Sequence, residues 1–115
     1  MFQLRPETLA RFAEAERAWF TTRLADHLRQ HFPDAAAEPD LRTAVREQVE
    51  HAAAFELRSE HSVALYVTAA WLLGASFAAD FPEAARILSS AAHTPAQKAA
   101  WLERWMELLF LALDE

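Results

Sequence analysis

The sequence has no cysteine and a single glycine, Gly74, in 115 residues. Without cysteine the chain has no disulfide framework, no thiol nucleophile and no thiolate metal site, which suits a reducing compartment. Hairpins and β-bulges repeatedly need positive φ angles, so one glycine argues against a β-rich fold. It also leaves no room for a Gly-rich phosphate-binding loop. These absences favour an all-α protein of the cytoplasm.

Basic residues are scarce as well. Eleven Lys and Arg stand against seventeen Asp and Glu, giving a net charge of −6. Nucleic-acid binding needs a clustered positive field, so we expect no nucleic-acid partner. Arginines recur every six residues from Arg5 to Arg29. A six-residue step turns by about 240° on a helix, so these arginines spiral around it and form no basic ridge.

One uncharged stretch, Ser62–Ala79, reaches the minimum length of a membrane span. It contains many alanines together with Thr68, Gly74 and Ser76, and its flanks lack the basic excess that orients a span. A central helix buried on all sides of a bundle produces the same pattern. We therefore expect a buried helix and no membrane span.

Helical periodicity and proline placement together predict an all-α fold, a compact single domain over residues 1–115 with about five helices. Phe32-Pro33 should end the first helix, with residues 34–38 as a connector, because the residue before proline disfavours the α conformation. The apolar run Val63–Phe77 should form the central helix, with Tyr66 and Trp71 largely buried. Thr94-Pro95-Ala96-Gln97 reads as a capping box for the last helix. The expected helix starts are Pro6, Pro39, Ser59, Pro82 and Pro95.

The polar residues offer little catalytic or metal-binding pattern. His27 and His31 lie one helical turn apart, a spacing that can present two imidazoles to one metal, but no third-ligand motif accompanies them. Ser59-Glu60-His61 contains catalytic residue types, yet adjacent residues on a helix point in different directions. We therefore predict no enzyme activity, no catalytic residue, no metal site and no cofactor.

Two apolar rows are the candidate protein-binding residues. On the first helix the row lies beside the core stripe of Ala13, Phe20 and Leu24, and on the last helix it lies beside Trp101, Trp105 and Leu109. Aromatic, Met and Arg content is typical of protein interfaces. The alternative is that a small bundle uses wide apolar arcs as core. The rows consist of Phe12, Glu16, Trp19 and Arg23, and of Met106, Phe110 and Leu113.

Several short motifs are similar to those of small helical accessory proteins encoded in type VI secretion effector operons of bacteria. The resemblance runs through most of the chain, and its motifs are largely structural. It implies a co-chaperone-like factor that binds a chaperone or an effector in the cytoplasm, with no catalytic residue. The matching residues are Phe32-Pro33, Glu60-x-x-Val63, Tyr66, Gly74-x-x-Phe77, Asp80-x-Pro82 and Ile87-Leu88.

We therefore expect a non-enzymatic accessory protein that acts through another protein, as a co-chaperone or adaptor. An immunity protein that occludes a cognate toxin is the first alternative, since an acidic surface suits a toxin with a basic cleft. A helical bundle that binds a small ligand or a metal is the second. The partner would be a chaperone, an effector or a toxin, and a homodimer is left open.

Overall fold

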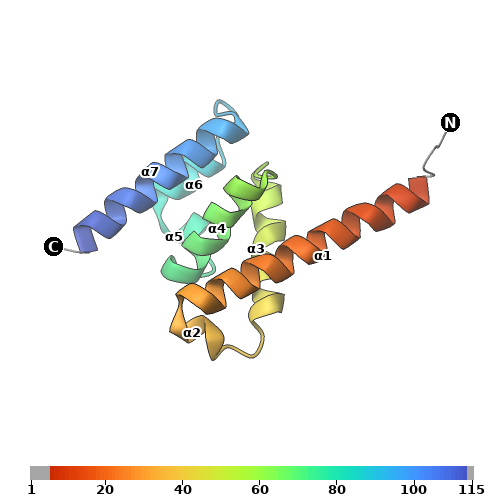
Figure 1. Cartoon of the computed structure of the whole chain (residues 1–115). Coiled ribbons are helices and arrows are strands. Elements are labelled where there is room, and N and C mark those ends of the chain that lie inside the picture. The colour runs from red at the N-terminus through yellow and green to blue at the C-terminus, as the bar shows by residue number, and fades with distance from the viewer. Residues whose placement is uncertain (1–5, 114–115) are drawn as a thin grey trace. The chain divides into compact units, whose positions relative to one another are not determined.

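The computed structural model describes the backbone of residues 6–113 and the side chains of residues 18–109 and of Leu111. All regular secondary structure in this part of the chain is helical and forms seven helices, which confirms the all-α prediction (Figure 1). Two of the seven, α2 and α5, are single turns of four residues, which explains why about five were expected. The helices are α1 (Pro6–His31), α2 (Pro33–Ala36), α3 (Leu41–Ala54), α4 (Glu60–Leu73), α5 (Phe77–Asp80), α6 (Pro82–Leu88) and α7 (Pro95–Leu113).

The chain divides into two compact units, Met1–Arg46 and Glu47–Glu115, with the boundary inside α3. A single domain over residues 1–115 therefore stays a prediction. In the first unit α2 packs against α1, as Figure 1 shows where the chain turns back after α1. Within its described side chains, from residue 18 onward, the buried apolar residues of this unit are Leu24, Ala25, Leu28, Ala35, Leu41 and Val45.

In the second unit α4 packs against α7 and α5, and α6 packs against α5 and α7 (Figure 1). Aromatic rings form much of its interior. Phe77 is completely buried and lies 4.9 Å from Tyr66 and 6.3 Å from Trp105 between ring centroids. Trp105 also stacks on Trp101 at 5.2 Å and meets Phe81 edge-on at 5.3 Å. This aromatic cluster joins α4, α5 and α7.

The predicted helix starts follow local backbone chemistry. Phe32 and Phe81, each before a proline, are extended, and the following prolines begin α2 and α6. Both hydrogen bonds of the capping box form. Thr94 Oγ1 accepts from the backbone amide of Gln97 at 3.1 Å, and Gln97 Oε1 accepts from the backbone amide of Thr94 at 2.8 Å. The starts of α6 and α7 agree with the prediction, whereas Pro33 was predicted only to end the first helix and also begins α2.

Some helix boundaries differ from the prediction. The third predicted helix begins as expected, with Ser59 accepting a hydrogen bond from the Ser62 amide, but α4 ends at Leu73 and Phe77 opens the separate turn α5. Gly74 ends α4 because it takes φ +114°, a conformation that side chains with a Cβ rarely adopt. Two smaller differences are that α3 begins at Leu41 rather than Pro39, and that the expected connector contains α2.

The burial of α4 is one-sided rather than complete. Tyr66 is 2% exposed, as expected, whereas Trp71 is half-buried and Leu72 is 36% exposed. The buried residues Val63, Tyr66, Val67 and Ala70 occupy one broad face of the helix. Trp71 lies at the edge of that face and is partly covered, so the predicted burial holds fully for Tyr66 and in part for Trp71.

Candidate protein-binding surface

Trp19 stands out on α1 because 63% of its surface is exposed. Among the side chains of α1 that the structure describes, from residue 18 onward, the buried ones are Thr21, Leu24, Ala25 and Leu28. At about 100° per residue these four share one face, and Trp19 lies on the opposite one. The buried face of α1 therefore differs from the predicted core stripe, which included Phe20. Phe20 is half-buried, and Trp19 projects from the far side of the helix rather than from beside the core.

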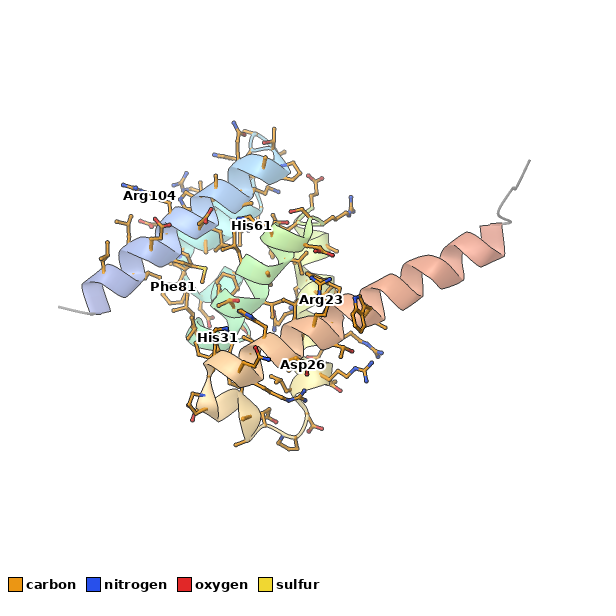
Figure 2. All side chains as sticks on the ribbon, in the orientation of Figure 1. Arg23, Asp26, His31, His61, Phe81 and Arg104 are labelled. Atoms are coloured by element: carbon orange, nitrogen blue, oxygen red, sulfur yellow. The ribbon has the colours of Figure 1, made fainter. Side chains whose placement is uncertain are left out.

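Arg23 follows Trp19 by one helical turn and is also exposed. Its guanidinium carbon lies 5.8 Å from the centre of the Phe20 ring, within the range of a cation–π contact. Further along the same side, Asp26 Oδ1 accepts a hydrogen bond from Arg29 Nη1 at 3.1 Å (Figure 2). The described part of this surface is therefore one large aromatic ring followed by a polar, charged turn.

Four of the predicted contact residues lie outside the side chains that the structure describes. They are Phe12 and Glu16 on α1, and Phe110 and Leu113 on α7. Of the predicted row on α1, the structure therefore places Trp19 and Arg23, and brings them together one turn apart. Of the predicted row on α7, it places Met106 alone.

Met106 belongs to the core rather than to an exposed surface. It is 7% exposed and shares the inward face of α7 with Leu102 and Trp105. The large exposed apolar residues among the described side chains of this helix are instead Leu108 (52%) and Leu111 (63%). Their signal was in the sequence: at about 100° per residue, Leu108 lies roughly 110° and Leu111 roughly 170° from the middle of the face formed by Leu102, Trp105 and Met106.

The His27–His31 pair and the Ser59-Glu60-His61 motif lie in different parts of the fold. The rings of His27 and His31 lie 4.4 Å apart at the end of α1, but no group of three potential metal ligands occurs among the described residues. Ser59 is hydrogen-bonded to Ser62, whereas His61 Nε2 lies 3.5 Å from Glu103 Oε2 on α7. Ser59 therefore acts as a helix cap, and the partner of His61 is Glu103 rather than Ser59.

Charge is distributed unevenly between the two units. Residues 1–46 contain seven arginines and seven acidic residues, whereas residues 47–115 contain four basic and ten acidic residues. The first unit is thus formally neutral, and the whole net charge of −6 lies on the second. Any long-range attraction of a basic partner would originate from the second unit.

Tyr66, the one tyrosine of the chain, gives a pH-dependent prediction. Burial raises the pKa of its hydroxyl above the ordinary 10.0. Above pH ~10 the unfolded chain releases this proton while the folded protein keeps it, so the free energy of unfolding should fall with rising pH. Below that pH the contribution is fully present.

Tyrosinate absorbance reports this single group. In the folded protein its midpoint should lie above that of the protein unfolded in denaturant, and Tyr66→Phe should lose less stability than the wild type above pH ~10. Equal midpoints for folded and unfolded protein would contradict the prediction.

Across the described residues, none of the helices has both the length and the apolar character needed to cross a bilayer. The uncharged stretch that raised the question is divided between α4 and α5. Comparisons with protein families, with curated proteins and with solved structures give no match to this chain.

Proposed function

We propose that the chain is a non-enzymatic protein-binding module that contacts its partner through the outward side of α1, centred on Trp19. The supporting observation is the 63% exposure of this tryptophan on the face opposite the buried residues of the helix. Tryptophan and arginine dominate the binding energy of many interfaces. Trp19 and Arg23, one turn apart, supply that pair of residue types.

For the biological role we propose an accessory factor, a co-chaperone or adaptor that assists effector loading in type VI secretion. The support is the resemblance carried by the short motifs around Phe32-Pro33 and Asp80-x-Pro82. The partner would then be a chaperone or an effector present in the cytoplasm. A chaperone gene and a secretion-spike gene beside the coding sequence would favour this role.

The charge distribution favours one second candidate, an immunity protein that covers a toxin's active site. The ten acidic residues of the second unit, against four basic ones, would complement a basic cleft. This candidate predicts contact through residues 47–115 and strong weakening by salt. The first candidate predicts contact through Trp19 and weak dependence on salt.

The test of the proposed function replaces Trp19 by alanine. Proteins that co-purify with the tagged wild type but not with Trp19→Ala would be identified, made separately and titrated against both forms. We expect binding to weaken by at least about thirtyfold, equivalent to ~2 kcal/mol, because the ring is the centre of the contact. The thermal unfolding of the variant should match that of the wild type, since the side chain lies outside the core.

Arg42→Ala provides the control, because Arg42 is an exposed arginine on α3. It should leave binding unchanged. A partner that binds Trp19→Ala as tightly as the wild type would contradict the role of α1. A large drop in melting temperature would contradict it too, because Trp19 would then be a structural residue.

A further inference from the structure

Helix α7 presents two opposite faces. Its inward face carries Lys98, Leu102, Trp105 and Met106, all of them buried. At about 100° per residue, a second set lies on the other side of the helix. All four of its members are exposed: Ala100, Arg104, Glu107 and Leu111. Figure 2 shows Arg104 on the side of α7 that faces away from α4.

The outward face is mixed, with the two charged residues Arg104 and Glu107 between the apolar Ala100 and Leu111. Leu111 is 63% exposed, and Leu108, which borders the same face, is 52% exposed. The four residues are spaced by four, three and four positions. Residues at this spacing lie on the side of a helix that faces a second helix in a coiled coil, and here the two central positions are charged rather than apolar.

We propose that this outer seam (Ala100, Arg104, Glu107 and Leu111) pairs with the same seam of a second copy of the chain, with the two α7 helices antiparallel. About a twofold axis between residues 105 and 106, Arg104 lies opposite Glu107 of the second copy. Ala100 lies opposite Leu111, so a small side chain meets a large one. Twofold symmetry repeats both contacts, because an isologous interface uses the same patch on each copy.

The charges on the outer seam determine both the relative direction of the two helices and the identity of the partner. A parallel, in-register pair would place Arg104 against Arg104 and Glu107 against Glu107, and like charges across an interface are repulsive. The antiparallel pair turns the same residues into two opposite-charge contacts. A strongly basic partner would match Glu107 but would meet repulsion from Arg104. The seam is therefore complementary to itself rather than to a partner of one sign.

The proposed dimer is small, since each copy contributes four seam positions and the flanking Leu108. An interface of this size gives reversible association that depends on concentration. It uses a helix other than α1 and goes beyond the proposed binding of a partner at Trp19. Each proposal can therefore fail without affecting the other.

The experiment is sedimentation equilibrium from about 10 µM to about 1 mM, a range that covers weak association. The average mass of the wild type should rise from 13.0 kDa toward twice that value. Arg104→Glu places like charges at both symmetric contacts, and so does Glu107→Arg. Each single variant should raise the dissociation constant by at least about tenfold. The double variant exchanges the two charges and should return to within about threefold of the wild type.

Two matched controls keep the result specific. Arg58→Glu and Glu50→Arg reverse the charge of exposed residues outside the outer seam, and both should associate like the wild type. Leu111→Ser tests the apolar contact and should weaken association without lowering the melting temperature, because the side chain is exposed. A wild type that remains monomeric near 1 mM overturns the proposal. So does a dimer indifferent to the single reversals, or one that the double variant fails to restore.

Discussion

Replacing Phe77 by alanine is expected to lower the free energy of unfolding by about 3–5 kcal/mol. The side chain is completely buried at the start of α5 and its ring contacts both Tyr66 and Trp105. Truncation removes the apolar surface of the ring and leaves a cavity where three helices meet. For a chain of this length the melting temperature should fall by roughly 10–20 °C.

Two companion variants separate the contributions in the Phe77 experiment. Phe77→Leu keeps most of the volume and should cost about 1 kcal/mol. Phe81→Ala removes a ring that touches the same Trp105 but is half-buried, so about 1–2 kcal/mol is expected. Chemical denaturation followed by circular dichroism measures all three. A loss for Phe77→Ala no larger than that for Phe81→Ala would show that the cluster does not centre on Phe77.

Local signals predicted the beginnings of most helices. The Thr94–Gln97 box and the extended residues before Pro33 and Pro82 depend on atoms only a few positions apart in the chain. Such contacts form in much the same way whatever surrounds them, so the sequence is sufficient to predict them. The end of α4 at Gly74 had an equally local signal. The predicted helix runs one turn too far because Phe77 continues the apolar periodicity beyond Gly74.

The orientation of the helices was harder to predict than their existence. Counting large apolar residues placed Phe20 in the core of α1, whereas the structure buries Thr21 and Ala25 and leaves Phe20 half-buried. Small side chains give only a weak hydrophobic signal, although they suit the close approach of packed elements. On α7, the buried Lys98 had no apolar signal at all. These two helices carry the candidate contact residues, which is why Met106 was predicted in a contact row and is found in the core.

Contacts between distant parts of the sequence could not be predicted. His61 meets Glu103 across α4 and α7, and Lys98 reaches Phe55 over 43 positions. Both contacts depend on which helices become neighbours after folding. Exposed residues such as Trp19 have the same property, because exposure is decided by what the rest of the chain leaves uncovered. A sequence pattern can nominate these residues, and packing decides their role.

The second large effect is expected at Lys98, the one lysine of the chain. Helix α3 ends in a Schellman motif: the Leu57 amide donates to the Ala52 carbonyl at 2.9 Å, and Glu56 takes a positive φ of 69°. This leaves the Phe55 carbonyl at the negative end of the helix dipole. Lys98 is 4% exposed and its ammonium donates to that carbonyl at 3.2 Å. Lys98 therefore joins the end of α3 to α7.

Lys98→Ala should lower the free energy of unfolding by about 2–3 kcal/mol, because it removes both a buried four-carbon stem and the charged donor. Lys98→Met keeps a stem of similar volume and removes only the ammonium, so a loss of about 1 kcal/mol is expected. Urea denaturation of the two variants beside the wild type measures the difference. Equal losses would assign the whole effect to the ammonium. A Lys98→Met protein as stable as the wild type would instead show that packing of the stem, and not the capping hydrogen bond to Phe55, holds α7 against the end of α3.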